Sequence, residues 1–336
     1  MKILYVGVDM AQAKFDGVAW CKQGQRQVDG YANNADGYRQ FAEKLEAQQA
    51  AEGADALHLI VEPTAGYQAG LLVFAYRKRW RITVVNPPDI RRWAQGMGKR
   101  AKTDVQDALM LAEYGERTQP DPQEEMPADL QALDLLLRRQ QDVKELVQSE
   151  RNRLFNVQNH PNLPEGVRQS LERSIERLEQ ESEQLQQEID NFVKSRPTLR
   201  KLRRLLLSIP GVGKNSVLPL LVLLHRFSAL TSGKGTSKQL VAFLGLDPMP
   251  YQSGRSVRRP SSISKKGDKV GRALLYMAAL GGVSGHNALR AFYRTLVDRG
   301  KPKKVALIAA ARKILVWAWA VFCSNSPFDP ALHPIS

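Results

Sequence analysis

Four acidic side chains occupy positions where the sequence pattern predicts strand ends and one helix face. Asp9 follows the apolar run 3–8, and Glu62 follows the apolar run 57–61. Asp104 and Asp107 are three residues apart, so on a helix they would share one face, one turn apart. A carboxylate at the end of a buried strand is costly to bury alone, so it needs a cation, a hydrogen-bond donor or solvent.

Carboxylates from two strand ends and one helix face can together hold two divalent cations. In phosphoryl transfer, such a pair activates the attacking oxygen and stabilises the leaving oxygen. All-oxygen ligands favour Mg²⁺, and we expect two ions per site. Taken singly, each position also fits a turn, a helix cap or a solvated helix face. Their joint placement beside the basic stretch 77–102, with nine Lys or Arg against one Asp, favours phosphoryl transfer.

A glycine-bearing turn separates two helical stretches in the second half of the chain. The residues Ile209-Pro210-Gly211-Val212-Gly213 have the form of the hairpin in a helix-hairpin-helix. Glycines there let backbone N–H groups approach a DNA phosphate, and the following helix N-terminus favours the anion. The turn is not a Walker A loop, because Asn215 replaces the required Ser or Thr. A tight turn without a ligand remains the alternative.

A basic segment with several serines follows from residue 251 onward. A serine such as Ser253, which precedes Gly254, could attack phosphorus if cations stabilised the alkoxide and the transition state. From spacing alone, passive phosphate binding is the expected role. The expected nucleic-acid-binding residues of the chain are Arg91, Arg92, Lys99, Arg100, Lys102, Gly211, Gly213, Lys214, Arg255, Arg258, Arg259, Lys265, Lys266 and Arg272.

The acidic residues require a sheet to position them. Strand patterns occupy 3–8, 17–21, 27–31, 57–61 and 82–85, with a hairpin around 22–26, and helical spacing occupies 37–49 and 67–79. This order fits a mixed sheet flanked by helices and matches the ribonuclease H-like fold. Residues 7–9 also fit the phosphate loop of an actin-like sugar kinase. That class needs further glycine-rich phosphate loops downstream, where this chain has a coiled-coil pattern instead.

Two long helical stretches, 128–159 and 165–194, follow a polar, proline-bearing linker at 116–127. The second stretch repeats apolar residues at intervals of four and three, the pattern of a coiled-coil seam, interrupted only by one serine. Both an intramolecular helical hairpin and a dimerisation arm would bury this seam. Its residues are Leu171, Ile175, Leu178, Ser182, Leu185, Ile189 and Phe192.

Composition limits the class of partner. The chain has 336 residues and a formal net charge of +15, which favours a polyanion such as nucleic acid. Cys21 and Cys323 are too few for a disulfide framework or a zinc site. Residues 305–323 are apolar but contain Arg312 and Lys313, so we expect no membrane span. No secretory signal pattern opens the sequence, and we expect a cytoplasmic protein.

The motifs occur in the order seen in one family of recombinases. They are Asp9 in Val-Gly-Val-Asp, Glu62 in Val-Glu-Pro-Thr-Ala-Gly-Tyr, Asn86-Pro87, Asp104 and Asp107 in Lys-Thr-Asp-x-x-Asp-Ala, the turn 209–213, and Gln252-Ser253-Gly254. In combination, they resemble the DEDD transposases of the insertion-sequence "one-ten" and "eleven-eleven" types, with Piv-type DNA invertases as relatives. The resemblance covers residues 9–328. One departure is Gly66, which stands one position later than in many members.

The resemblance implies a RuvC-like, ribonuclease H-like catalytic domain at 1–120, a coiled coil at 128–198 and a mainly helical transposase domain at 199–330. It assigns the four acidic catalytic and metal-binding positions to Asp9, Glu62, Asp104 and Asp107, and the nucleophile to Ser253, through a phosphoserine intermediate. The implied partners are donor and target double-stranded DNA, a guide (bridge) RNA, and further copies forming dimers that pair into a tetramer. The implied location is the cytoplasm of a bacterium, at the nucleoid.

The sequence therefore predicts an RNA-guided DNA transposase or site-specific recombinase. A Piv-type invertase and a Holliday-junction resolvase-like nuclease that uses only the carboxylates are the alternatives among enzymes. A non-catalytic DNA- or RNA-binding scaffold is the alternative outside them. Whether cleavage depends on metal, and whether it depends on Ser253, distinguishes these classes.

Overall fold

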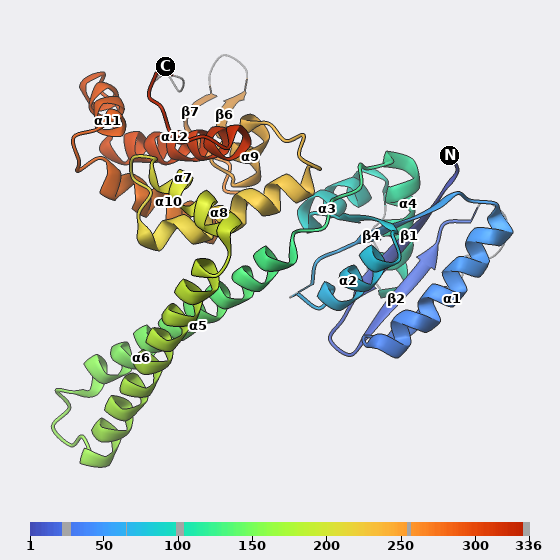
Figure 1. Cartoon of the computed structure of the whole chain (residues 1–336), viewed down its shortest axis with the longest axis horizontal. Helices are drawn as coiled ribbons and strands as arrows, with labels where there is room; N and C mark the ends of the chain where they lie inside the picture. The colour runs from blue at the N-terminus through green and yellow to red at the C-terminus, as the bar shows by residue number, and fades with distance from the viewer. Residues whose placement is uncertain (22–27, 65, 99–103, 254–256, 332–336) are drawn as a thin grey trace. The chain divides into compact units, whose positions relative to one another are not determined.

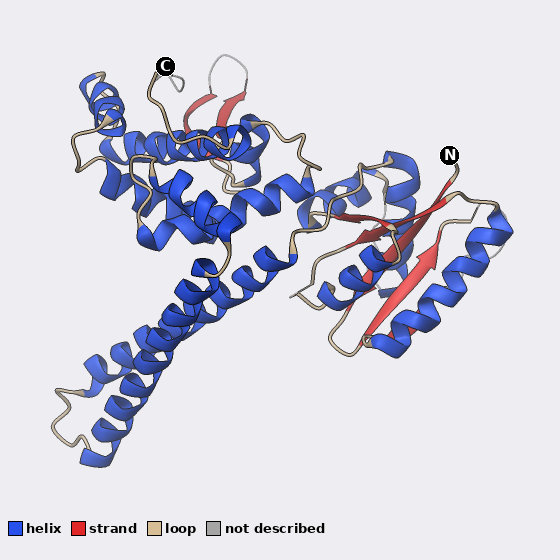
Figure 2. Ribbon diagram, viewed as in Figure 1, coloured by secondary structure: helices blue, strands red, loops and turns tan. Residues whose placement is uncertain are grey.

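The computed structural model describes residues 1–336 except 22–27, 65, 99–103, 254–256 and 332–336. For residues 104, 105, 250–253 and 257–261 it describes the backbone. The chain divides into two compact units. The N-terminal unit comprises Met1–Glu125 with Ser228–Lys234, and the C-terminal unit comprises Met126–Phe227 with Gly235–Ser336. The first is a mixed α/β unit and the second is mostly helical (Figure 2).

The described strands of the N-terminal unit form a five-stranded sheet in the order β3-β2-β1-β4-β5. The first three strands are antiparallel neighbours, whereas β4 and β5 run parallel to β1. This mixed sheet confirms the α/β prediction for the first part of the chain. The strands are β1 (Ile3–Met10), β2 (Lys14–Ala19), β3 (Asp29–Ala32), β4 (Ala56–Val61) and β5 (Arg81–Val84).

Helices cover both faces of this sheet (Figure 1). On one face, Phe41 of α1 (Ala35–Glu52) and Leu71 of α2 (Ala69–Arg77) pack with Val6 and Val8. On the other face lie α3 (Pro87–Gly96) and α4 (Asp104–Thr118), whose Ile90 and Leu111 pack with Tyr5 and Ile60. Alternate residues of β1 therefore serve two separate cores, as expected for a strand buried on both sides.

One local prediction for this unit was wrong, and one helix was not predicted. Strand β2 begins at Lys14 rather than at Gly17, because the chain reverses directly after Met10, with the Ala11 N–H donating to the Lys14 carbonyl at 2.9 Å. Helix α3 was not predicted, although Pro87 and Pro88 in its first turn suit a helix start, where the missing N–H groups are not needed. The expected hairpin loop at 22–26 lies outside the described residues.

The segment 119–127 is not a free linker, in contrast to the prediction for 116–127. Helix α4 continues to Thr118, and the backbone N–H of Gln123 then donates to the Ile82 carbonyl at 2.7 Å. The Gln123 side chain donates to the Val84 carbonyl at 2.9 Å, and the Thr83 hydroxyl donates to the Asp121 carbonyl at 2.9 Å. This segment is therefore bound along the outer side of β5.

Helices α5 (Ala128–Val157) and α6 (Glu165–Lys194) form a long hairpin (Figure 1). Arg139 pairs with Glu181 at 2.6 Å, and the buried Gln140 side chain donates to Gln186 at 2.9 Å. The expected seam is used within the chain: Ile189 is buried, and the other seam residues are partly buried. The intramolecular hairpin, one of the two alternatives, is thus present.

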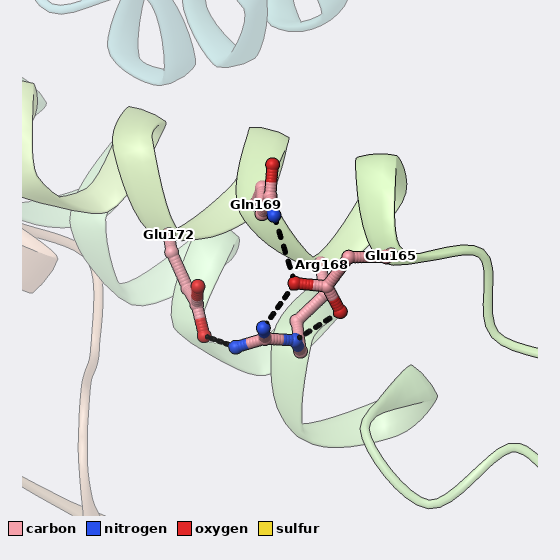
Figure 3. A network of polar contacts seen from close by, with 4 residues as sticks. All are labelled: Glu165, Arg168, Gln169 and Glu172. Carbon is pink, nitrogen blue, oxygen red and sulfur yellow. Dashed lines mark hydrogen bonds and ion pairs between the residues drawn. The ribbon is translucent and has the colours of Figure 1, made fainter.

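An exposed polar network lies in the first turns of α6 (Figure 3). Arg168 bonds both Glu165 and Glu172, and Gln169 donates to Glu165 at 2.8 Å. These hydrogen bonds, from Arg168 first, lower the pKa of Glu165. A glutamate at the positive end of the helix dipole adds to this local stabilisation.

The other helices of the C-terminal unit pack around one apolar helix, α12 (Lys303–Ser324). Its Ile314, Leu315 and Trp317 are buried. Helix α12 has the length and hydropathy of a membrane span, but 56% of its most apolar window is buried within the structure, as in the core helix of a globular unit. The surrounding helices are α7 (Pro197–Leu207), α8 (Lys214–Leu230), α9 (Ser237–Phe243), α10 (Lys269–Gly282) and α11 (Ala288–Asp298).

A two-stranded hairpin interrupts these helices (Figure 2). It consists of β6 (Pro248–Ser253) and β7 (Val257–Ile263), paired antiparallel with an irregularity between Met249 and Tyr251. The sequence pattern predicts a basic loop here. Prolines at 248, 250 and 260 masked the strand pattern, although proline is tolerated where a strand lies at the edge of a sheet, as both strands of a two-stranded hairpin do.

Candidate catalytic site and nucleic-acid surface

Asp9 and Glu62 lie side by side at the carboxyl edge of the sheet. Val8 of β1 is paired with Val61 of β4 in parallel register, and each acidic residue is the next one along its strand. Neighbouring strands are separated by about 4.8 Å. Both side chains are half-buried. The register of one strand pair therefore brings together two acidic residues that are distant in the sequence.

Helix α4 packs so closely on β1 that a side chain at Gly7 has no room. A Cβ atom on Gly7 would lie 1.9 Å from the Ala108 carbonyl oxygen and 2.4 Å from the Ala112 nitrogen. Seven residues after Ala108, Gly115 lies against Tyr5 of β1 and Ile60 of β4. Tyr5 is nearer than Gly7 to the start of β1. The helix therefore runs opposite to β1, with its N-terminal turn at the end of the strand where Asp9 lies.

The first turn of α4 carries the other two expected acidic residues. Asp104 opens the helix, and Asp107 immediately precedes Ala108, the residue in contact with Gly7. Asp9 follows Gly7 by two positions and so projects from the same face of the sheet, toward α4. Glu62 likewise follows Ile60 by two positions, and Ile60 lies against Gly115 of α4, so Glu62 also projects toward α4. The four positions therefore converge on one corner of the N-terminal unit.

The arrangement of the carboxylates as metal ligands differs from their common location. Among the described side chains, no group of three His, Cys, Asp or Glu residues is arranged to hold a metal ion. Asp9, Glu62 and Asp107 are among these side chains, whereas the side chain of Asp104 lies outside the described residues. The donor set itself, carboxylates only, has the hard-oxygen chemistry that Mg²⁺ requires.

Asp16 is a fifth acidic residue at this corner, and the sequence patterns do not indicate it. It is the antiparallel partner of Asp9 in the β1–β2 register, and directly opposed residues project to the same face. Its carboxylate lies over Gly30 and 3.9 Å from the Lys14 ammonium. Only the position of β2 reveals this pairing. The three-residue turn after Met10 has none of the residues by which turns are usually found.

Helix α3 begins beyond the carboxyl end of β5, at the same edge of the sheet. Ile90 is buried, and Trp93 packs edge-on against Tyr114 of α4 with ring centroids 5.4 Å apart. Arg91 and Arg92 are exposed to solvent, and Arg92 pairs with Asp89. The other basic residues expected here, Lys99, Arg100 and Lys102, lie outside the described residues.

A buried histidine lies in β4, four residues before Glu62. His58 of β4 is fully buried, with its Nε2 2.8 Å from the Thr83 hydroxyl. Burial, followed by the nearby charge of Arg81, lowers the pKa of His58 to about 4. The imidazole is therefore neutral near pH 7, and we assign it to the core rather than to the site.

The turn between α7 and α8 has two different faces. Gly211, with φ of 92°, packs against α10, where an added Cβ would lie 2.8 Å from the Ala278 carbonyl oxygen. This close packing gives Gly211 a structural role that needs no DNA. Gly213 has open space where a Cβ would lie, and Lys214 is exposed at the start of α8. Of the predicted phosphate contacts in this turn, Gly213 and Lys214 are the accessible ones.

Ser253 is the last residue of β6. Its backbone is paired with Val257, and the next pairs in the hairpin join Gln252 with Arg258 and Tyr251 with Arg259. Gly254 and Arg255 lie outside the described residues. After β7, Lys265 and Lys266 are exposed. The Arg272 guanidinium is fixed by donation from Nη1 to the carbonyls of Leu244 at 3.0 Å and Gly267 at 2.8 Å.

Comparison with known proteins gives the family. A DEDD transposase profile of the IS110 type, described as a transposase, matches residues 6–158, and a second, described as "Transposase IS116/IS110/IS902 family", matches residues 203–294. A pilin gene-inverting protein of Moraxella lacunata is 30% identical over 334 residues, covering 99% of this chain and 100% of the relative. The chain belongs to the IS110 family of DEDD transposases. The protein is thus a DNA-recombining enzyme of a family that uses divalent metal.

Further relatives cover different shares of this IS110-family transposase. The pilin gene-inverting protein of Moraxella bovis is also 30% identical, over 99% of this chain and 100% of its own length. An insertion element IS900 protein of Mycobacterium paratuberculosis is 27% identical over 167 residues, 47% of this chain and 39% of that protein. The first family match spans the four acidic positions, and the second spans the turn 209–213 and Ser253.

Proposed function

We propose that this enzyme cleaves and rejoins DNA by phosphoryl transfer, with Asp9, Glu62, Asp104 and Asp107 as metal ligands and Ser253 as nucleophile. The observation that carries the proposal is the register of β1 and β4, in which Val8 pairs with Val61 and the next residues are Asp9 and Glu62. The contact of Gly7 with Ala108 adds the first turn of α4 to the same corner.

A RuvC-like catalytic domain is the finer fold that we propose for the N-terminal unit. Three antiparallel strands followed by two parallel ones, in the order β3-β2-β1-β4-β5, support it. Acidic residues at the ends of the central strands and on a helix across the sheet also support it. We also propose the domain boundaries that the family resemblance implies. They are 1–120, 128–198 and 199–330.

The acidic corner fits Mg²⁺ by its chemistry, and we propose two ions per site. Asp9 and Asp16 are directly opposed across one strand pair, and a bound cation would offset their repulsion in addition to the Lys14 ammonium, which lies 3.9 Å from Asp16. When bound, the metal would lower the pKa of the attacking hydroxyl and offset negative charge on the leaving oxygen. The role of the protein's carboxylates is to hold and orient the ligands at the sheet edge.

The serine accounts for rejoining. The Ser253 oxygen would attack phosphorus, forming a P–O bond to serine while the bond from phosphorus to the 3′ oxygen breaks. The serine proton would pass to a carboxylate and then to the departing 3′ oxygen. A new 3′-hydroxyl would displace the serine in the reverse step, so no ATP is needed. Arg255, Arg258 and Arg259 would stabilise the charge on phosphorus.

The nucleic-acid partners follow from charge and from the family. The net charge of +15 and the exposed Arg91, Arg92, Lys214, Lys265 and Lys266 support binding to phosphate backbones. We propose that these surfaces serve donor DNA, target DNA and a structured guide RNA, in dimers that pair into a tetramer at the nucleoid. Sequencing the RNA that co-purifies with the protein tests the guide.

A trapped intermediate tests the nucleophile. A nicked substrate that cannot be religated is allowed to react, the protein is digested, and any nucleotide adduct is mapped by mass spectrometry. We expect the adduct on Ser253, with Ser253→Ala inactive and Ser262→Ala active as the matched control. An adduct on Ser256, Ser261, Ser262 or Ser264 would reassign the role. Metal-dependent cleavage without any adduct would favour a resolvase-like nuclease.

DNA inversion is a second candidate for the biological reaction. The full-length similarity to two pilin gene-inverting proteins favours it, since the insertion-element relative covers under half of the chain. A plasmid that carries two recombination sites in inverted orientation separates the two reactions. Inversion of the intervening DNA indicates an invertase, and excision of an element with insertion elsewhere indicates a transposase.

A further inference from the structure

A cavity of about 310 Å³ lies within the C-terminal unit, between α10, α12 and the end of β7. Its volume is at the lower end of the range of roughly 300–1000 Å³ for small-molecule sites. Leu246, Ile263 and Ile308 supply apolar walls, and Ala273 and Ala311 add two small apolar side chains. Tyr276 is the aromatic residue of the lining.

Three cations complete the lining: Lys265, Arg272 and Lys304. In the described part of the chain, no acidic side chain forms an ion pair with any of them. The two lysines are exposed, whereas Arg272 is partly buried and held by the carbonyls of Leu244 and Gly267. Three like charges around one apolar space repel each other, so an occupant that carries negative charge would stabilise them.

We infer that this cavity takes one unpaired nucleobase of a bound nucleic-acid strand, with an adjoining phosphate held by Lys265, Arg272 and Lys304. The inference rests on the proposed function, because it assumes that the enzyme binds nucleic acid through this unit. It assigns a base-binding role to Tyr276 and Ala273 and a phosphate-binding role to Lys304.

Each part of a nucleotide has a matching part of the lining. A base is a flat, largely apolar ring that stacks on aromatic side chains and fits between apolar walls. A phosphate is bound by Lys and Arg without regard to sequence. An amino-acid side chain of a partner would fill the apolar part but would not offset three cations. A free anion would offset the cations but would leave the apolar walls unused.

The position of the cavity along the chain suggests its use. Ile263 ends β7 and pairs with Pro248, at the end of the hairpin opposite to Ser253. A nucleotide anchored at Ile263, Lys265 and Tyr276 would fix the register of a strand held by this unit. Such an anchor acts on positioning rather than on bond cleavage.

Binding of two labelled 12-nucleotide strands to the full-length protein tests the inference. One is oligothymidine and the other has the same sugar-phosphate chain with abasic sites, so both carry the same charge. For the unmodified protein, we expect oligothymidine to bind at least about fivefold more tightly. Ala273→Leu, which fills the cavity, and Tyr276→Ala should each remove most of this difference.

Matched variants separate the cavity from the general surface. Ala291→Leu makes the same substitution at an exposed position of α11 outside the cavity and should keep the full difference. Lys304→Gln should weaken both strands and lower the salt dependence by about one charge, more than Lys303→Gln in the same turn. Oligothymidine with 5-iodouracil in place of thymine should photo-cross-link to Tyr276, as mapped by mass spectrometry. Unchanged thermal unfolding of Ala273→Leu shows that this variant is folded.

Equal affinity of the unmodified protein for both strands would overturn the inference and leave the proposed function intact. A cross-link elsewhere, with Ala273→Leu and Ala291→Leu behaving alike, would also overturn it. If neither strand bound at low salt, nucleic-acid binding by this enzyme would itself be contradicted, and the proposed function would fail with it.

Discussion

The two units of this transposase differ in how they collect charge. In the N-terminal unit, acidic residues converge because strand register and one close helix contact place them at a sheet edge. In the C-terminal unit, cations gather around an apolar cavity, on a loop and two helices that follow a hairpin. The first arrangement suits metal-assisted chemistry, and the second suits holding a strand. Under the proposed function, metal binding belongs to the sheet edge, whereas strand binding is spread over loops and helices of the C-terminal unit, which also carries Ser253.

Removing one carboxylate should have the largest effect. We expect Asp9→Asn or Glu62→Gln to lower strand cleavage by at least about 100-fold, because the site loses both charge and a metal ligand. Affinity for nucleic acid, measured by fluorescence anisotropy, should change little, since positioning contacts come from the basic surfaces.

Asp55→Asn is the matched control for these variants. Asp55 lies beside the other end of β4, where it accepts a hydrogen bond from the Lys2 backbone at 2.6 Å. Cleavage by this variant should remain near normal. Near-normal cleavage by Asp9→Asn would remove Asp9 from the site and break the proposed contrast between the units.

Substitution of Gly7 should lower the free energy of unfolding more than substitution of any other small residue of the N-terminal unit. Gly7→Ala would place a methyl group 1.9 Å from the Ala108 carbonyl oxygen, so the helix must move. Overpacking of this kind costs about 1–3 kcal/mol of unfolding free energy, and rigid backbone contacts favour the upper end. Denaturant unfolding measures the loss. Gly96→Ala in α3, which meets open space, should be neutral or slightly stabilising.

A smaller effect should appear as a pH dependence of the N-terminal unit. The folded pKa of His58 is about 4, below its usual 6.5, so the unfolded chain binds a proton that the folded chain does not. The contribution of neutral His58 to the free energy of unfolding should therefore be fully present above pH 6.5. It should fall as the pH drops toward 4, by about 2 kcal/mol between pH 7 and pH 5. Hydrogen exchange of β4 amides should detect this, and His58→Gln should reduce the slope. An unchanged slope would place the imidazole in a charged state or in contact with water.

The polar network on α6 should contribute least. Arg168→Gln removes the bonds to Glu165 and Glu172, but these side chains are exposed, and solvent screens such pairs. The midpoint of thermal unfolding should not shift measurably. A clear shift would mean that these residues are covered in the assembled protein, which size-exclusion chromatography with light scattering would reveal.

The sequence predicts most accurately those elements whose pattern is decided locally. Strands β1 and β4 are continuous apolar runs, and the boundaries of α5 and α6 match the predicted stretches closely because the heptad pattern is long. The predicted corner at Asp9 and Glu62 depends only on these strands being parallel neighbours. Local patterns do not indicate the position of Asp16, which lies at the corner because β2 pairs with β1. They also do not indicate the cavity at Tyr276, which forms only when α10 and α12 pack.

Proline-containing segments were the main source of error. The hairpin of β6 and β7 and helix α3 both contain prolines, which weaken strand and helix patterns unless their exact position in the element is known. A linker at 116–127 is predicted for the same reason, whereas residues 119–127 are bound to β5. The role of this segment depends on an exposed strand edge from a distant part of the sequence, and composition cannot indicate that.

The binding of this segment to β5 has a consequence for the behaviour of the protein at high concentration. A terminal strand with free N–H and C=O groups is a template for strands of other molecules, and so promotes domain swapping and aggregation. Residues 121–124 occupy part of that template, since Gln123 takes up the carbonyls of both Ile82 and Val84. The chain thus covers part of one edge of its own sheet, which disfavours open-ended β-stacking between copies of the protein.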